Sequence, residues 1–171
     1  MVSRRDFFTA FKNINEGEVL TVRPPYGKNE SSFIDNCPSC EDKACVKACE
    51  QKIIFITDDG TPTLDFSKVG CTFCEDCAKK CEANILSLEN IETCEVINAK
   101  FLIKPEACVA HNGVICFSCK EPCIDNAILF NGMFNPVIDM DRCTGCGYCI
   151  GKCITNAIDH SAISINSIVV K

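Results

Sequence analysis

The sequence predicts an α+β fold of two tandem halves in which cysteines take over part of the role of an apolar core. Cysteine supplies 17 of the 171 residues, far above its usual share of a soluble protein. The hydrophobic share of 47% counts all of these cysteines, and the chain has no tryptophan and two tyrosines. Because a chain of this length normally buries a larger conventional core, we expect the cysteines to stabilise the fold.

The cysteines form four groups with a shared spacing. The second and fourth groups read C-x2-C-x2-C-x3-C, the first reads C-x2-C-x4-C-x3-C, and the third reads C-x7-C-x2-C-x3-C. In chain order the groups are Cys37, Cys40, Cys45, Cys49; Cys71, Cys74, Cys77, Cys81; Cys108, Cys116, Cys119, Cys123; and Cys143, Cys146, Cys149, Cys153. Cys94 is left over, and the pattern assigns it no role.

This spacing favours iron–sulfur clusters over disulfides or zinc. An odd cysteine count and the expected lack of a signal peptide argue against a disulfide framework. Zinc sites typically join two separated cysteine pairs or include histidine, whereas this chain has triplets and only His111 and His160. A C-x2-C-x2-C loop can wrap three corners of a 4Fe–4S cubane. The sequence therefore predicts four 4Fe–4S clusters, with the sixteen grouped cysteines as iron ligands.

The fourth cysteine of each group is expected to ligate the other cluster of its half, as in two-cluster bacterial ferredoxins. Cys49 and Cys81 would be exchanged between the first two clusters, and Cys123 and Cys153 between the last two. The first and third groups depart most from the regular motif. Without Cys108 as a ligand, the third site would keep three cysteines and would favour a 3Fe–4S cluster.

An internal duplication sets the domain organisation. Cys71 and Cys143 lie 72 positions apart, as do Cys81 and Cys153, and such a repeat marks the structural unit. We predict two tandem dicluster ferredoxin-type units at residues 30–100 and 101–171. An N-terminal docking or extended segment at residues 1–29 precedes them.

Short alternating runs predict the strands of each half. Strands are expected before the two regular groups, at residues 63–66 and 136–139. Further strands are expected after the fourth cysteines, at residues 53–57, 85–88, 128–130 and 163–165. Gly60 and Gly132 are expected in the turns between such strands.

The segment ahead of the first cysteine group lies outside the duplication. Ser3-Arg4-Arg5 is similar to the start of a twin-arginine export signal, but polar residues interrupt the apolar region that should follow, so export is not expected. Phe7, Phe11 and Ile14 predict a short amphipathic helix that either packs on the chain or docks on a partner. Residues 23–27, which contain two prolines, are expected to be extended and to pack along the cluster domain.

Composition excludes several classes of function. A net charge of −6 and a pI of about 4.9 argue against nucleic-acid binding, and no run reaches the roughly 18 apolar residues of a membrane span. The sequence contains no catalytic constellation, so we expect an electron-transfer protein rather than an enzyme. Because bound clusters would lower the net charge to about −14, a redox partner is expected to present a basic surface.

The chain resembles the NapF-like ferredoxin-type accessory proteins of periplasmic nitrate reductase systems. The likeness rests on Ser3-Arg4-Arg5, on Arg23-Pro24-Pro25, on the regular groups that begin at Cys71 and Cys143, and on the isolated Cys108. It implies a cytoplasmic polyferredoxin that contacts the precursor of the nitrate reductase catalytic subunit and helps to mature it. The alternative is a general soluble electron carrier or an electron-transfer subunit of another oxidoreductase. Unlike many bacterial ferredoxins, the chain has no proline directly after any fourth cysteine.

Overall fold

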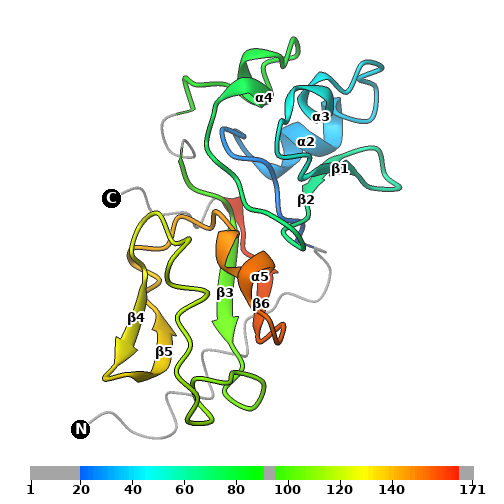
Figure 1. The fold of residues 1–171 in the computed structure, drawn as a ribbon. Helices are drawn as coiled ribbons and strands as arrows, with labels where there is room; N and C mark the ends of the chain where they lie inside the picture. Colours follow the sequence, from blue (N-terminus) through cyan, green and yellow to red (C-terminus); the bar gives the residue numbers. More distant parts are fainter. Residues whose placement is uncertain (1–19, 91–94, 166–171) are drawn as a thin grey trace, which may run out of the picture.

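The computed structural model describes residues 20–90 and 95–165, which form two lobes (Figure 1). The first lobe, residues 20–90, contains α2 (Glu30–Asn36), α3 (Ala44–Ala48), β1 (Ile54–Ile56), β2 (Pro62–Leu64) and α4 (Asp76–Lys79). The second lobe, residues 95–165, contains β3 (Ala99–Ile103), β4 (Ile128–Asn131), β5 (Phe134–Ile138), α5 (Tyr148–Lys152) and β6 (Ile158–Ala162). This mixture of short helices and strands confirms the α+β class. The predicted N-terminal helix and Cys94 lie outside the described residues.

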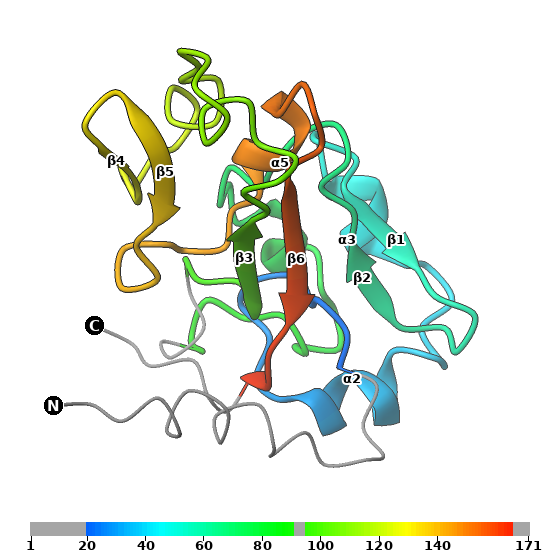
Figure 2. The same ribbon diagram turned by 90° about the horizontal axis from the view of Figure 1, so that it is seen from below.

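The strands form three two-stranded antiparallel sheets. β1 pairs with β2 and β4 pairs with β5 as hairpins. Figure 2 shows the third sheet, β3 with β6, between these two hairpins. Gly60 and Gly132 lie in the hairpin turns with φ of 80° and 73°, a left-handed conformation that glycine adopts without steric cost. The hairpins confirm the strands predicted around residues 53–66 and 128–139.

Two of the predicted strands were wrong. The strand expected at residues 163–165 lies earlier, as β6 at Ile158–Ala162. It pairs with β3, a strand that the sequence pattern did not predict. The strand expected at residues 85–88 is reduced to one bridge between Gly27 and Leu86. The chain after Gly27 does not continue as a strand because α2 begins at Glu30, where the Asn29 Oδ1 caps the helix by accepting from the Ser32 N–H at 2.8 Å.

Residues 23–27 pack along the rest of the first lobe, as expected. The Arg23 side chain is 3% exposed and forms an ion pair with Glu30. It also donates to the Thr61 Oγ1 at 2.7 Å and to the Pro62 carbonyl at 2.8 Å. These partners offset the cost of removing a guanidinium from water. The segment does not stay extended throughout, because Tyr26 adopts a φ of 71° in a turn.

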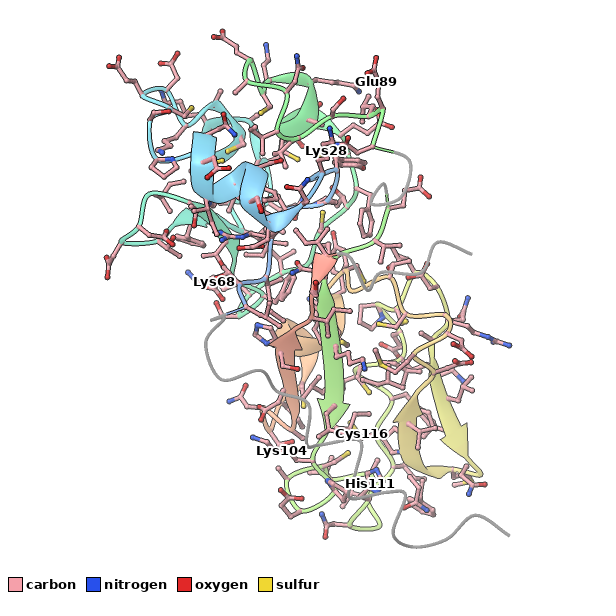
Figure 3. All side chains as sticks on the ribbon, turned by 180° about the vertical axis from the view of Figure 1, so that it is seen from behind. Lys28, Lys68, Glu89, Lys104, His111 and Cys116 are labelled. Carbon is pink, nitrogen blue, oxygen red and sulfur yellow. The ribbon has the colours of Figure 1, made fainter. Side chains whose placement is uncertain are left out.

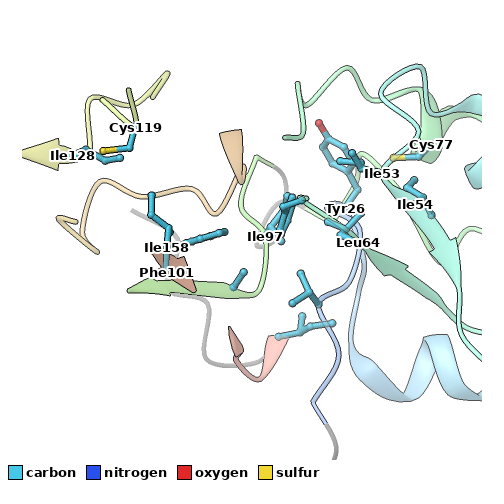
Figure 4. Packing of buried hydrophobic residues seen from close by; sticks show 14 of the residues in the cluster. Tyr26, Ile53, Ile54, Leu64, Cys77, Ile97, Phe101, Cys119, Ile128 and Ile158 are labelled. Carbon is cyan, nitrogen blue, oxygen red and sulfur yellow. The ribbon is translucent and has the colours of Figure 1, made fainter. Parts of the chain in front are cut away.

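The apolar core continues from one lobe into the other. Buried side chains of both lobes lie along it, including Tyr26, Leu64 and Ile97 (Figure 4). Phe66 of the first lobe is fully buried against Phe101 and His160 of the second, with ring centroids 5.8 and 5.5 Å away.

A buried asparagine adds polar contacts to this junction. Asn98 accepts from the Arg23 N–H at 2.7 Å and donates to the carbonyls of Thr21 and Ile163, both at 2.9 Å. Segments near both ends of the described chain are thus tied to Asn98, directly before β3. Within the described residues, no helix has the length and apolar character needed to cross a bilayer.

Candidate iron–sulfur sites

A short helix follows three of the four cysteine loops and carries the third cysteine of the group. In each case the residue before the helix is left-handed, with φ between 45° and 82°. These residues are Lys43 before α3, Glu75 before α4 and Gly147 before α5. The left-handed residue turns the chain sharply from the loop into the helix that carries the third cysteine.

In the first lobe, four cysteines line a cavity of about 340 Å³. They are Cys37, Cys40 and Cys45 of the first group and Cys81 of the second. Burial, followed by the effect of the neighbouring Cys45 and Cys81, raises the pKa of Cys37 to about 11. The Leu86 N–H donates to the Cys81 Sγ at 3.5 Å. We call these four residues the first set; it joins three cysteines of one group to the fourth of the next.

The second set consists of Cys71, Cys74 and Cys77 together with Cys49. The pKa of Cys71 is raised to about 11, mainly by burial. A hydrogen bond from the Phe73 N–H opposes this rise, and the Cys49 and Cys74 thiols add to it. Burial, followed by the effect of the neighbouring Cys71 and Cys74, raises the pKa of Cys77 to about 12. The Tyr26 hydroxyl donates to the Phe73 carbonyl at 3.0 Å and ties this loop to the N-terminal part of the first lobe. Cys74 is the exposed member of the set.

The third set lies in the second lobe and includes the isolated Cys108. Its cysteines line a small hollow: Cys108, Cys116, Cys119 and Cys153. Burial raises the pKa of Cys119 to about 11; its own backbone N–H opposes the rise, and Cys108 and Cys153 contribute to it. The Ala157 N–H donates to the Cys153 Sγ at 3.2 Å.

The stretched loop of this group folds back on itself, which keeps Cys108 beside Cys116. The Asn112 N–H and side-chain amide both donate to the Cys108 carbonyl, at 3.2 and 2.9 Å. His111 is half-buried, with its Nε2 3.0 Å from the Pro136 carbonyl oxygen. The loop is therefore anchored on the β4–β5 hairpin.

The fourth set lines another hollow of the second lobe: Cys123, Cys143, Cys146 and Cys149. Burial raises the pKa of Cys143 to about 11; the Gly145 N–H lowers it, and Cys146 and Cys123 raise it. Burial also raises the pKa of Cys149, and the nearby Cys146 and Cys143 add to the rise. The Ala127 N–H donates to the Cys123 Sγ at 3.3 Å.

The chain is similar to known proteins along most of its length. The 4Fe-4S binding domain family matches residues 136–159, which contain the fourth cysteine group. The ferredoxin-type protein NapF of Escherichia coli K12 is 33% identical over 141 residues, which cover 80% of this chain and 82% of that protein. The chain belongs to the NapF family of ferredoxin-type proteins. It is therefore an iron–sulfur electron-transfer protein of the 4Fe–4S type, which confirms the resemblance found in the sequence.

Two further relatives extend the comparison. NapF of Haemophilus influenzae is 28% identical over 163 residues, covering 92% of this chain and 89% of the relative. The methylamine utilization ferredoxin-type protein MauM of Methylorubrum extorquens is 28% identical over 162 residues, covering 84% and 72%. The similarity thus extends well beyond a single cysteine motif.

The cysteine sets of this NapF-like chain have the donor chemistry of iron–sulfur sites. Thiolates are soft ligands that select iron–sulfur clusters, and backbone N–H groups that donate to sulfur stabilise the ligated form. Within residues 20–90 and 95–165, no three Cys, His, Asp or Glu side chains converge closely enough to hold a single metal ion. Burial raises the pKa of thiols such as Cys37, Cys71 and Cys143 to about 11. These thiols are therefore protonated near neutral pH, and cluster binding would release their protons.

The structure also shows a turn after every fourth cysteine that the pattern analysis missed. The residue three positions after each fourth cysteine is left-handed, with φ between 50° and 54°, and its N–H donates to the carbonyl of that cysteine at 3.0 to 3.2 Å. These residues are Lys52, Asn84, Asn126 and Asn156. Asparagine enters this conformation more readily than other side-chain-bearing residues. The signal was the recurring C-x2-N, which three of the four groups carry.

Replacing the one lysine in these turns is expected to stabilise the chain. Lys52→Asn should raise the free energy of unfolding by up to about 1 kcal/mol, because it relieves a left-handed strain that asparagine tolerates. The matched control is Asn156→Lys, which should lower the stability by a similar amount. The denaturant midpoint of the cluster-loaded protein, followed by visible absorbance, measures both. A lower midpoint for Lys52→Asn would contradict this explanation of the turns.

Proposed function

We propose that this chain is a polyferredoxin that holds four 4Fe–4S clusters and transfers single electrons without a catalytic site of its own. The main support is that each of the four sets gathers four cysteines from two groups that are separated along the chain. A bound cluster exchanges one electron at a time with its redox partner. The chain's own residues hold the cluster, exclude water and direct N–H groups at sulfur, and these factors set the reduction potential.

All sixteen grouped cysteines act as iron ligands in this proposal. Cys49 completes the second set and Cys81 the first, while Cys123 completes the fourth set and Cys153 the third. The chain then comprises two dicluster units, at residues 30–100 and 101–171, after a segment at residues 1–29. β3 crosses the nominal boundary between the units.

We further propose that the protein acts as a cytoplasmic accessory factor that matures the catalytic subunit of a periplasmic nitrate reductase. Support comes from membership of the NapF family. The net charge of −6 before cluster binding suits a basic surface on that partner. A general electron carrier is the second candidate, favoured by the similarity to a relative named for methylamine utilization.

The exchange of fourth cysteines is tested by a pair of single variants and their double variant. If Cys49 serves the second cluster, Cys45→Ser and Cys49→Ser damage different clusters, and the double variant loses about twice the iron of either single variant, up to about eight atoms. If both serve the first cluster, the double variant loses no more iron than one single variant, which would reject the exchange. Iron and sulfide analysis of anaerobically purified protein measures the outcome.

The accessory role is tested by deleting residues 3–11. We expect affinity for the purified catalytic-subunit precursor to fall at least tenfold, about 1.4 kcal/mol, with the electron paramagnetic resonance (EPR) spectrum of the clusters unchanged. As a control, the deletion should leave the rate of electron exchange with a small-molecule reductant unaltered. Equal loss of binding and of clusters would show that the segment stabilises the fold, and unchanged binding would favour the general carrier.

A further inference from the structure

The loops of the second and fourth cysteine sets touch each other across the junction of the lobes. The Cys71 N–H donates to the Cys146 carbonyl at 2.7 Å. Cys71 belongs to the second set and Cys146 to the fourth, and 75 residues separate them in the sequence. The backbone of one cluster loop is therefore hydrogen-bonded directly to the backbone of the other.

This approach is possible because glycines occupy both sides of the junction. A Cβ atom at Gly70 would lie 2.4 Å from the Cys146 carbonyl oxygen and 2.5 Å from the Tyr148 nitrogen. A Cβ atom at Gly151 would lie 2.3 Å from the Lys68 carbonyl oxygen. Neither glycine has a positive φ, so space rather than backbone conformation requires glycine at both positions.

Further contacts hold the fourth set's loop in this position. The Ile97 N–H, shortly before β3, donates to the Thr144 carbonyl at 2.8 Å. The Phe66 ring lies so close to Gly147 that a Cβ there would be 2.2 Å from it. The junction is thus tied by hydrogen bonds on two sides and packed by a buried ring.

The first and third sets lie away from this junction. All residues that line the cavity of the first set belong to the first lobe, and all residues that line the hollow of the third set belong to the second lobe. Cys116 of the third set lies near the end of the second lobe that is remote from the first (Figure 3). Of the four sets, the second and the fourth are therefore the pair that meets at the junction of the lobes.

We propose that electrons pass through the protein in the order first, second, fourth and third set, with the crossing between lobes at the contact of Cys71 with Cys146. This inference rests on the proposed function. In the crossing step the second site is oxidised by one electron and the fourth site is reduced by one, and no covalent bond or proton moves. Gly70 and Gly151 act as positioning residues, because they set how closely the two loops approach.

The test is EPR spectroscopy of the fully reduced, cluster-loaded protein, in which neighbouring paramagnetic clusters show spin–spin interaction. Gly70→Ala and Gly151→Ala should each abolish the interaction between lobes and leave the sum of two separate dicluster spectra, with iron and sulfide content unchanged. The control is Gly132→Ala, since Gly132 lies in the β4–β5 turn with nothing near its Cβ position. This variant should keep the interaction, and a full interaction in both junction variants would overturn the proposal.

A second experiment covers the case in which the junction variants fail to assemble. Cys40→Ser combined with Cys116→Ser removes a ligand from the first and third sets and leaves the junction intact. The account predicts that the two remaining 4Fe–4S clusters still interact magnetically. Two intact but non-interacting clusters in the double variant would refute the order. If the unmutated protein itself held iron for only two clusters, the four-cluster function would be refuted instead.

Discussion

The structure depends on one constraint, which is that cysteines from separate parts of the chain must meet in sets of four. The β1–β2 hairpin lies between Cys49 and Cys71, and the β4–β5 hairpin lies between Cys123 and Cys143. Each hairpin reverses the chain, so that a regular cysteine group returns beside the group before it. The short helices and left-handed turns then aim individual sulfurs. The helices and strands of both lobes are short because the closely spaced cysteine groups leave only short segments between them.

The two lobes differ in the strand pairing that accompanies each hairpin. In the second lobe, β3 and β6 pair over five residues and place Phe101 and His160 against Phe66. In the first lobe the corresponding pairing shrinks to the bridge between Gly27 and Leu86, and α2 follows instead. The buried Arg23, paired with Glu30, anchors the entering chain there. The first lobe thus uses a polar network where the second uses a sheet.

Cysteine spacing predicted the class of cofactor. Short alternating runs, with Gly60 and Gly132 in the turns, predicted the α+β class and both hairpins, because these features follow from local patterns of residues. β3 escaped prediction because its partner, β6, lies about 60 residues away and no local signal links them. The strand expected at residues 163–165 was misplaced because an apolar run was preferred over Ile158–Ala162, which includes Asp159 and His160. The contact between Cys71 and Cys146 could not be predicted, since Gly70 and Gly151 look like ordinary loop glycines until their neighbours are known.

In the proposed cluster-loaded protein, four clusters occupy the place of a larger apolar core. The most direct measurement is iron and acid-labile sulfide per chain in anaerobically purified protein, with circular dichroism recorded before and after the iron is removed by a chelator. We expect about sixteen irons and sixteen sulfides per chain. Removal of the clusters should abolish the circular dichroism signal of the folded protein. Bound zinc without sulfide, or a metal-free chain that still unfolds cooperatively, would contradict it.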